Sequence, residues 1–384
     1  MKPFALSSIR RQNLVKVLDL LTLAPAMTRQ ELAEAAGLSL MTVTNLVDLL
    51  KEQGVLHFNP IHRECVTRHP TGRKADAISL TGARKAWLLV DISNSLLTMT
   101  LVGFDVGLLL ALHDDQRGDY LPRLEQFLRS GSRQVLAALG DRELLGVAVV
   151  TPGPYDLASD TVNNQRLPQL NGVRIKEMFR RCFGEYEYYV DEDVKFAVRS
   201  FSDLTVSRQC EVLYYLYIGE GVGGAAVHGG NMLRGLNATA GDAGHLLSGE
   251  RVTFESLLGT EAFIGLLGLE ESLSAEERLE AVCRIAREEP GRYDAALEEM
   301  AAVAARMLHA VLWMLDPTHI IVDCVYARPR GDVFIQALSW HMQAMFEGEN
   351  RVLPQLYPGA SGLSSVVRGA VHVLQGAWLD RILM

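Results

Sequence analysis

Residues 215–245, YLYIGEGVGGAAVHGGNMLRGLNATAGDAGH, contain the most informative pattern in this chain. An apolar run over 213–218 predicts a strand, and a second strand follows over 225–228 after a glycine corner. A Gly-Gly turn and a loop ending in Gly-Asp-Ala-Gly-His complete the segment. Glycines gather at a strand end where backbone N–H groups approach a phosphate, or where two backbones pack closely. Both interpretations apply to the corner, which consists of Gly219, Gly221, Gly223 and Gly224.

The composition is that of a globular protein with more than one domain. The chain has 384 residues, 48% of them hydrophobic. A chain of this length is too long for a single core. No apolar run approaches the roughly 20 residues of a membrane helix, and the N-terminus lacks a signal-peptide core. The scattered cysteines form no CxxC pair, so we expect reduced, mostly buried thiols in the cytoplasm. They are Cys65, Cys182, Cys210, Cys283 and Cys324.

Charge is distributed unevenly along the chain. The whole chain carries 37 Lys and Arg against 46 Asp and Glu, a net charge of −9. Residues 1–85 carry 12 basic and 7 acidic residues, a net of +5, which leaves 25 basic and 39 acidic residues, a net of −14, for the remainder. A basic head on an acidic body is expected when one domain alone meets a polyanion.

Residues 1–83 are predicted to form a small helical domain followed by two strands. Apolar residues at helical spacing predict a first helix over 9–23. Thr28 begins a Thr-x-x-Glu capping box for a second helix, which Gly37 ends, and Ser39 caps a third. The short Gly-Leu-Ser link between the second and third helices is typical of a helix-turn-helix.

The third helix of such a domain places its first turns in the major groove of DNA. Polar side chains there can read base edges, and a methionine can contact a thymine methyl group. Strands over 55–58 and 76–80 enclose a basic loop, which we interpret as a wing that contacts the minor groove or phosphates. A partner-docking module with a solvated basic face is the alternative. The predicted DNA-binding residues are Ser39, Met41, Thr42, Thr44, Asn45, Arg68, Arg73 and Lys74.

The rest of the chain alternates strands and helices in an α/β order. Apolar runs over 87–91, 96–103 and 108–112 predict three antiparallel strands, and βα units follow them. The same patterns continue after the glycine-rich segment to a last helix over 364–383. This order predicts two α/β lobes, and the cleft between two lobes is the usual place for a ligand.

Residues 215–245 resemble the signature of the ROK family (repressors, open reading frames, sugar kinases). The resemblance is carried, in order, by the glycine corner, Arg234-Gly235 and the Ala-Gly-x-x-Gly-His ending. It implies an actin/sugar-kinase-like (ribonuclease H-like) body, and a winged-helix head of the kind that ROK repressors carry and ROK kinases lack. The implied domains are 1–83 for the head, 84–194 with 364–384 for the first lobe, and 195–363 for the second lobe with dimerisation.

The family's nucleotide contacts are altered at three places. The first phosphate loop, Asp-x-Gly-Gly-Thr in the family, is residues 91–95, DISNS, where side chains replace both glycines. In the second loop, Gly-Thr-Gly-x-Gly-Gly, Glu220 replaces the hydroxyl, and a carboxylate repels a polyphosphate. Residues 323–325, DCV, replace glycines expected beside the adenine. The resemblance therefore implies that the protein uses no ATP or other cofactor and is not an enzyme.

The resemblance also implies a sugar pocket with altered residues. Family members hold sugar hydroxyls with an Asn-Asp pair, a Glu-x-Gly-His and a later Glu, because these groups make paired hydrogen bonds. The Asp of the pair, here Asp193, is then a vestigial catalytic base, or an acid that stabilises a helix N-terminus. A structural ion-pair cluster is the alternative to a pocket. The predicted ligand-binding residues are Arg166, Glu192, Asp193, Asp242, His245 and Glu255.

Zinc is not expected. Most of the family follows the Gly-His with a Cys-x-Cys…Cys loop, whereas residues 246–254, LLSGERVTF, contain no cysteine. We interpret the chain as a cytoplasmic repressor of sugar genes that binds double-stranded DNA as a homodimer or higher homo-oligomer, senses a sugar or sugar phosphate, and has no membrane partner. Two alternatives stay open: an ATP-dependent sugar kinase with a DNA-binding head, and a regulator controlled by a protein partner without a small-molecule ligand.

Overall fold

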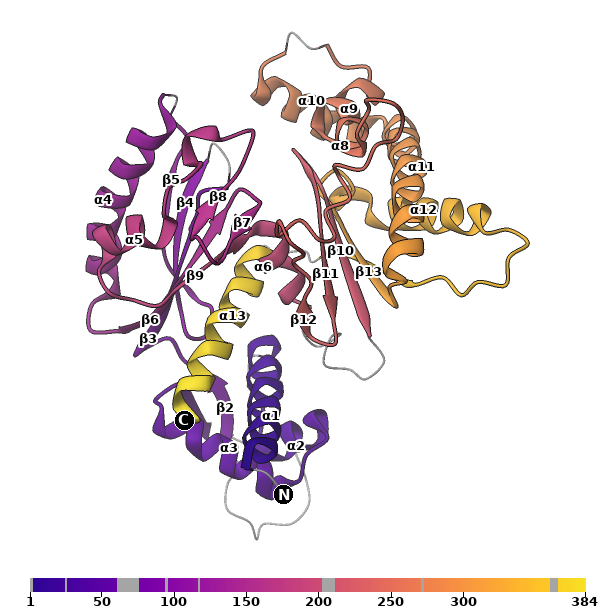
Figure 1. Cartoon of the computed structure of the whole chain (residues 1–384). Helices are drawn as coiled ribbons and strands as arrows, with labels where there is room; N and C mark the ends of the chain where they lie inside the picture. The colour runs from indigo at the N-terminus through magenta and orange to yellow at the C-terminus, as the bar shows by residue number, and fades with distance from the viewer. Residues whose placement is uncertain are drawn as a thin grey trace. The chain divides into compact units, whose positions relative to one another are not determined.

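A computed structural model of the protein describes residues 3–24, 26–60, 76–93, 96–116, 118–201, 211–270, 273–359 and 365–384 (Figure 1). The chain forms two compact units, Met1–Glu192 with Ala370–Met384, and Asp193–Gly369. The last helix, α13 (Ser365–Ile382), begins in the second unit and ends in the first.

The first unit begins with the helix-turn-helix head. The Thr28 side chain accepts a hydrogen bond from the Glu31 amide, and the Glu31 carboxylate accepts one from the Thr28 amide at 2.7 Å, so the predicted capping box is confirmed. Gly37 ends the second helix with a φ of 65°, and the Ser39 side chain caps the third by accepting from the Thr42 amide. The head consists of α1 (Pro3–Leu23), α2 (Arg29–Ala36), α3 (Leu40–Glu52), β1 (Leu56–Pro60) and β2 (Asp76–Leu80).

A buried apolar face holds these helices together. The helices α2 and α3 meet at 115°. Leu32 of α2 and Val43 and Leu50 of α3 are fully buried with residues of α1, as the periodicity predicts. Val47 is also buried because it lies on the same helix face as Val43, whereas Leu49 is half-buried.

The first unit continues with a sheet whose described strands are ordered β5-β4-β3-β6-β9. The three predicted antiparallel strands are confirmed. The strand β6 runs parallel to β3 beside it, and β9 runs parallel to β6. The turn between the second and third strands contains Val106 at a φ of 63°. The elements are β3 (Lys85–Asp91), β4 (Leu97–Gly103), β5 (Leu108–Asp114), α4 (Tyr120–Leu139), β6 (Glu143–Thr151), β7 (Tyr155–Asp156), β8 (Thr161–Val162), η1 (Pro168–Leu170), α5 (Ile175–Phe183) and β9 (Tyr188–Glu192).

Both faces of this sheet are covered, which explains the continuous apolar runs of its central strands. The helices α4 and α5 pack on one face. On the other, Trp378 of α13 packs edge-to-face on Phe104 at 5.0 Å, and Arg381 donates to the Leu145 carbonyl at 2.8 Å. The end of α13 also meets the head, where Asp380 forms an ion pair with Arg11 of α1.

The second unit is built on a second sheet, whose described strands are ordered β12-β11-β10-β13-β14. The predicted strands of the glycine-rich segment form its antiparallel hairpin, and β13 runs parallel to β10. The elements are α6 (Asp193–Arg199), β10 (Val212–Ile218), β11 (Val222–His228), β12 (Asn231–Met232), α8 (Phe254–Leu258), α9 (Thr260–Leu266), α10 (Ala275–Glu288), α11 (Pro290–Leu315), β13 (His319–Cys324), η2 (Arg328–Arg330), α12 (Gly331–Met345) and β14 (Gln355–Pro358).

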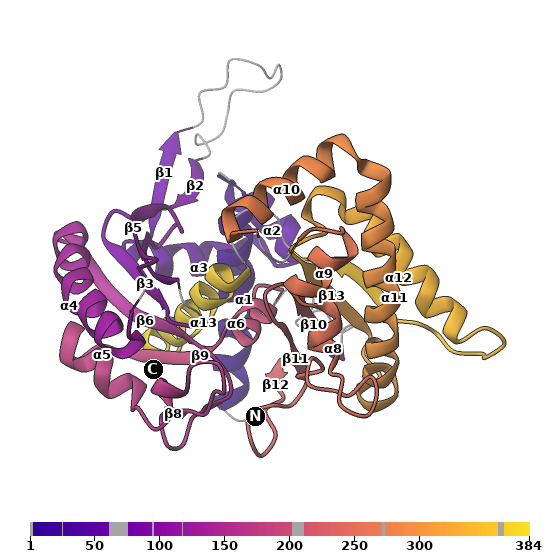
Figure 2. The ribbon, with the colours of Figure 1, turned by 90° about the horizontal axis from the view of Figure 1, so that it is seen from above.

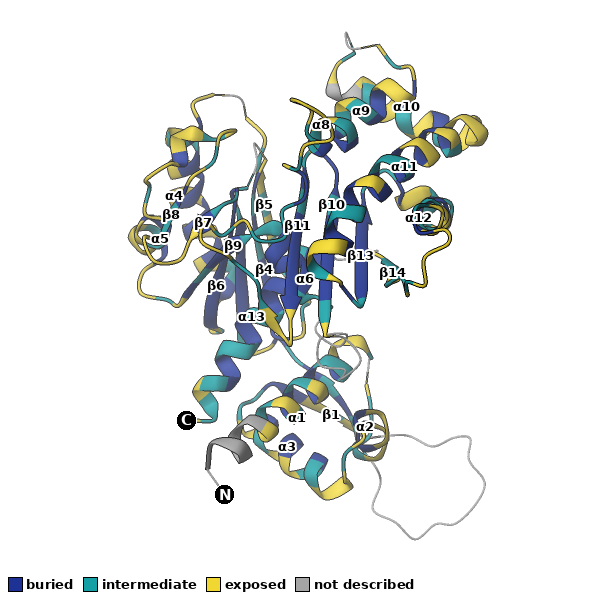
Figure 3. Ribbon diagram, turned by 45° about the vertical axis from the view of Figure 1, so that its right-hand side comes forward, coloured by how far each residue is buried: buried dark blue, intermediate teal, exposed yellow. Residues whose placement is uncertain are grey.

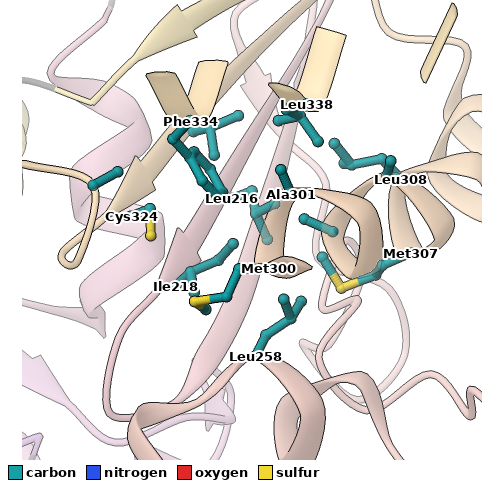
Figure 4. Packing of buried hydrophobic residues seen from close by; sticks show 14 of the residues in the cluster. Leu216, Ile218, Leu258, Met300, Ala301, Met307, Leu308, Cys324, Phe334 and Leu338 are labelled. Atoms are coloured by element: carbon teal, nitrogen blue, oxygen red, sulfur yellow. The ribbon is translucent and has the colours of Figure 1, made fainter. Parts of the chain in front are cut away.

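Alternate residues of β10 enter two separate cores. Leu216 and Ile218 pack against α8, α11 and α12 in the core that Figure 4 shows, together with Met300 and Leu338. Leu213 and Tyr215 of the same strand pack against α6 on the opposite face. Figure 3 shows β10, β11 and β13 in dark blue along most of their length, as expected for strands buried on both faces.

Two expectations from composition can be compared with the structure. Among the described cysteines, Cys324 is buried, Cys182 is half-buried and Cys283 is exposed, whereas Cys65 and Cys210 lie outside the described residues. Burial raises the pKa of the Cys324 thiol to about 12, which keeps it protonated and unreactive. No single helix of the described chain is long and apolar enough to span a bilayer; taken together, the bent pair α2 and α3 passes the same criterion of length and composition.

Candidate DNA-binding face and candidate ligand residues

The third helix of the head, α3, presents an exposed face at its N-terminal end. Met41 is 76% exposed, and Asn45 lies one turn further along and is also exposed. In the part of the chain that the structure describes, the side-chain amide of Asn45 makes no hydrogen bond, so its donor and acceptor are available to a ligand. An exposed amide and thioether one turn apart suit a base edge and a thymine methyl group.

The hydroxyl groups of the same face are already engaged within the helix. Ser39 lies 2.8 Å from the Thr42 hydroxyl and accepts from the Thr42 amide, and Thr44 donates to the Leu40 carbonyl at 2.8 Å. These bonds stabilise the first turn of α3. Each hydroxyl oxygen still has acceptor capacity, so Ser39, Thr42 and Thr44 stay predicted DNA-binding residues.

A basic aromatic cluster joins the helix-turn-helix to the wing strand β1. The Arg29 guanidinium lies 5.7 Å from the centre of the Phe58 ring, and the Lys51 ammonium lies 5.3 Å from it. Arg29 also lies 3.3 Å from the Asp48 carboxylate. Two cations from α2 and α3 thus hold β1 beside the recognition helix. The predicted wing residues Arg68, Arg73 and Lys74 lie outside the described residues.

The glycine corner of the second unit is a tight turn between β10 and β11. The Gly219 amide donates to the Gly221 carbonyl at 2.9 Å, and Gly223 and Gly224 belong to the strand β11. A side chain at Gly224 would overlap the Tyr214 hydroxyl and the Gly241 carbonyl oxygen. A side chain at Gly244 would likewise overlap the Val222 carbonyl. Close backbone packing of the Gly-Asp-Ala-Gly loop on β11 therefore accounts for these glycines.

Aromatic side chains lie against the first glycine of the corner. The Tyr326 hydroxyl donates to the Gly219 carbonyl at 2.9 Å and lies 2.6 Å from the Thr260 hydroxyl. The Tyr326 ring stacks on Phe263 with 4.4 Å between centroids. Burial raises the pKa of the Tyr326 hydroxyl to about 12, so it stays a donor at neutral pH. Sequence reasoning missed this contact because Tyr326 is 107 residues away from Gly219 along the chain.

The end of β13 carries a buried acid at the position of the adenine-side glycines. The Tyr215 hydroxyl donates to the Asp323 carboxylate at 2.8 Å, and Arg328 lies 3.8 Å from the other oxygen of that carboxylate. Burial, followed by the charge of Asp323, raises the pKa of Tyr215 well above its ordinary value. A side-chain carbon at Gly359 would lie 2.5 Å from the Asp323 side chain, so Gly359 packs directly against Asp323.

In the first unit, Asp91 ends β3, where the first phosphate loop would begin. Its carboxylate accepts hydrogen bonds from the Ser93 amide at 2.8 Å and the Ser93 hydroxyl at 2.6 Å. Burial raises the pKa of the Asp91 carboxyl, although these bonds partly oppose the shift. Residues 94 and 95 of the predicted loop lie outside the described residues.

Three of the predicted ligand residues meet in the second unit. The His245 Nε2 lies 3.7 Å from the Asp242 carboxylate, and its Nδ1 lies 3.6 Å from that of Glu255. The His245 side chain is 71% exposed, whereas Asp242 and Glu255 are largely covered. The Glu255 amide donates to the Gly244 carbonyl, which fixes α8 to the glycine loop. An exposed imidazole between two carboxylates can donate to and accept from neighbouring hydroxyls.

The remaining predicted ligand residues belong to different units of the chain. Glu192 ends β9 in the first unit and accepts from the Tyr155 amide at 3.1 Å, so it holds the loop over 151–156. Asp193 is the first residue of α6 in the second unit and accepts from the Val194 amide at 2.7 Å. Arg166 is exposed in the first unit, and its amide donates to the Asn164 side chain.

A lysine that we did not predict lies two residues after Asp193. Lys195 is 1% exposed, and its ammonium donates to the Ala238 carbonyl in the loop before Asp242. A buried ammonium needs such partners, because its desolvation is costly. Among the described residues, no three His, Cys, Asp or Glu side chains are placed to hold a metal ion.

Comparison with known proteins identifies both parts of the chain. The model of the ROK family matches residues 122–375, and a model of winged helix-turn-helix DNA-binding domains matches residues 10–56. The chain belongs to the ROK family. Uncharacterized protein y4fQ of Sinorhizobium fredii is 24% identical to this ROK protein over 349 residues, which cover 88% of this chain and 84% of y4fQ.

Solved structures differ in how much of this ROK protein they match. A ROK family transcriptional regulator, a homologue of the Escherichia coli MLC protein, matches with a TM-score of 0.66 at 17% identity over 98% of both chains. The ROK glucokinase of Streptomyces griseus, in complex with glucose and AMPPNP, has a TM-score of 0.61 at 17% identity. The match covers 98% of that glucokinase but only 75% of this chain. The predicted order of a winged helix-turn-helix head and a sugar-kinase-like body is therefore confirmed.

Proposed function

We propose that this ROK protein is a transcriptional repressor of genes for sugar metabolism or uptake. Its head binds a two-fold operator as part of a dimer, and its body binds a sugar or sugar phosphate without transferring a phosphoryl group. Ligand binding changes transcription because ligand-free and ligand-bound states differ in affinity for DNA. The protein acts in the cytoplasm, where it meets both DNA and sugar.

One combination of features supports this proposal most strongly. The α3 face is exposed at Met41 and Asn45, whereas the corner that would cradle phosphates is packed by Tyr326 and carries Glu220 at its tip. Phosphoryl transfer depends almost entirely on positioning and on stabilising the charge of the phosphates. A corner with an added carboxylate and a carbonyl already bound to a tyrosine opposes both requirements.

Genome-wide mapping of bound DNA tests the DNA-binding part. We expect discrete sites upstream of sugar transport or sugar metabolism genes, and loss of these sites in the Asn45→Ala variant. Binding that is spread without preference, or unchanged by Asn45→Ala, would count against a sequence-specific regulator. The genes next to the sites also indicate which sugars to test.

Calorimetric titration of the full-length protein with a panel of sugars and sugar phosphates tests the effector. We expect one class to bind, and His245→Ala with Glu255→Gln to weaken that binding. Arg166 favours an anionic ligand, because guanidinium pairs well with carboxylate and phosphate. If no sugar produces heat while DNA binding is intact, control by a protein partner replaces the effector in this proposal.

A sugar kinase with a DNA-binding head is the second candidate, and Asp193 is the observation that favours it. A carboxylate at the start of α6 can accept a hydroxyl proton from a sugar. This candidate predicts ATP-dependent phosphorylation of a hexose that Asp193→Asn abolishes. We expect no such activity, and the assay is made with Mg²⁺ and ATP on the full-length protein.

A further inference from the structure

Tyr217 lies on the face of the second sheet that α6 covers. The helix α6 lies against β10 and β11 (Figure 2). Tyr217, the next-to-last residue of β10, packs against the cluster of buried residues on this face, which includes Val194 of α6. Its partner in β11 is Gly223, and a side-chain carbon there would lie 3.0 Å from Val194. The start of α6, where Asp193 precedes Val194, therefore lies beside Tyr217.

The phenol of Tyr217 covers the first glycine of the corner. A side chain at Gly219 would overlap the Tyr217 hydroxyl and would lie 2.6 Å from the ring carbon that carries this hydroxyl. Tyr326 binds the carbonyl of the same glycine. Gly219 is thus held between two aromatic side chains, one at its α-carbon and one at its carbonyl. A glycine lets a ligand approach the backbone closely because it has no side chain, and here the Tyr217 phenol takes that space.

The hydroxyl of Tyr217 differs from those of the tyrosines near it. Tyr214, Tyr215 and Tyr326 each donate a hydrogen bond of 2.8 or 2.9 Å to an oxygen of the second unit. The Tyr217 hydroxyl makes no hydrogen bond within the described chain, although its side chain is half-buried. Covered tyrosines ordinarily direct the hydroxyl to a partner. This hydroxyl is therefore available to a ligand as a donor and an acceptor.

The charges around this hydroxyl oppose an anion. Burial, followed by the charges of Asp193 and Asp323, raises the pKa of Tyr217 above its ordinary value, so the hydroxyl stays protonated at neutral pH. Glu220 adds a carboxylate at the tip of the turn, and Arg328 lies 3.8 Å from Asp323 and partly offsets its charge. A phosphate placed here meets carboxylates, whereas an uncharged hydroxyl can accept from the phenol.

We propose that Tyr217 is a ligand-contacting residue that selects for an uncharged group at the glycine corner. Its ring excludes phosphate from Gly219, and its hydroxyl donates a hydrogen bond to a hydroxyl oxygen of the ligand. A phosphate or carboxylate of the ligand then lies away from the corner. The hydrogen bond rests on the proposed sugar ligand, whereas the exclusion of phosphate does not depend on it.

Calorimetric titration of the full-length protein with Mg²⁺ and tripolyphosphate tests the exclusion. This probe carries a phosphate chain without an adenine, so it needs no contact at the end of β13. We expect Tyr217→Ala to bind the probe at least about tenfold more tightly than Tyr217→Phe, which keeps the ring. Tyr217→Phe should bind it like the wild type. The basic head is the same in all three proteins, so only the difference between them reports on the corner.

The outcomes separate the exclusion from a loss of folding. Circular dichroism and thermal unfolding show whether each variant keeps its fold. Tyr217→Val, whose smaller apolar side chain still packs on Val194, makes the same test if Tyr217→Ala unfolds. A folded Tyr217→Ala or Tyr217→Val variant that binds tripolyphosphate no more tightly than Tyr217→Phe would overturn the proposal.

Titration with neutral sugars and their phosphates tests the hydrogen bond. Tyr217→Phe should weaken binding of the sugar by about fivefold, because it removes one donor and keeps the ring. Tyr189→Phe is the matched control, since the Tyr189 hydroxyl donates to the exposed Glu187 in the first unit. Equal sugar affinity of Tyr217→Phe and the control would contradict the ligand contact. A panel in which no sugar binds would count against the proposed effector, while the tripolyphosphate titration still decides the role of the ring.

Discussion

The hydroxyl of Tyr326 donates a hydrogen bond of 2.9 Å to the carbonyl oxygen of Gly219. Gly219 begins the turn that carries the glycine corner, and Tyr326 follows the strand β13 two residues after its end. The bond therefore joins the glycine corner to the segment that follows β13. It ties the turn to its own unit rather than leaving it open to a phosphate.

Removing this hydroxyl is expected to destabilise the protein modestly. Tyr326→Phe removes the shorter of two hydrogen bonds to the buried Gly219 carbonyl and leaves the one from the Thr260 hydroxyl at 3.5 Å, at a cost of about 1 kcal/mol in the free energy of unfolding. Urea unfolding measures the change. Tyr357→Phe is the control, because the Tyr357 hydroxyl binds only the exposed side chain of Gln355 among the described residues. Equal effects of the two substitutions would contradict the contact.

Gly224 tests the close packing of the glycine loop on β11. A methyl group there would overlap the Tyr214 hydroxyl and the Gly241 carbonyl, and the backbone oxygen cannot swing away. We expect Gly224→Ala to lower the free energy of unfolding by about 1–3 kcal/mol. Gly265→Ala, in α9 with open space around it, should be neutral or slightly stabilising. A wild-type melting temperature for Gly224→Ala would show that these glycines serve another purpose.

Local signals predicted the head and most strands, because those signals act within a few residues. The capping box of Thr28, the left-handed Gly37 and the cap at Ser39 mark the helix ends directly. The glycine corner was harder, because a glycine shows only that a side chain is absent. Whether Gly224 makes room for a phosphate or for Gly241 depends on where residue 241 folds. The contacts of Tyr326 and Lys195 join segments distant in sequence, and no local pattern predicts them.

The pH dependence of stability should carry a contribution from Asp91. Burial raises the pKa of this carboxyl above that of the unfolded chain, so the folded state binds the proton more tightly. Its ionisation therefore destabilises the fold as pH rises through the folded-state pKa, and the effect vanishes below the unfolded pKa of about 3.9. Asp91→Asn keeps an oxygen for the Ser93 donors. It should raise the free energy of unfolding at pH 7, with a difference that shrinks towards pH 4.

Chemical unfolding of Asp91→Asn and wild type over this pH range tests the sign. Asp156→Asn is the opposite case, because hydrogen bonds from Ser159 and the Ala158 amide lower the pKa of Asp156. Asp156→Asn should lower the free energy of unfolding at pH 7, and the substitution should have no such effect at acid pH. If the free energy of unfolding changes with pH by the same amount in Asp91→Asn and wild type, the burial of the Asp91 carboxylate does not affect stability.

Asn45 should contribute to affinity for the operator rather than to affinity for DNA of any sequence. The side-chain amide of Asn45 is exposed on α3 and makes no hydrogen bond within the described chain, so it can pair with an adenine edge. Asn45→Ala should weaken operator binding by about 1–3 kcal/mol and relax preference at one position of each half-site. Arg73→Ala should instead weaken binding to all sequences and reduce the salt dependence. Fluorescence anisotropy with operator and mismatched duplexes at several salt concentrations measures both.

Selection of genomic DNA fragments by the purified full-length protein, followed by sequencing, tests the central claim most directly. An intact reading helix on a body that does not phosphorylate sugars predicts strong enrichment of a two-fold symmetric sequence. Asn45→Ala should reduce this enrichment and relax one position of each half-site, and Asp193→Asn should retain it. A wild-type protein that enriches no sequence above the Asn45→Ala background would contradict it.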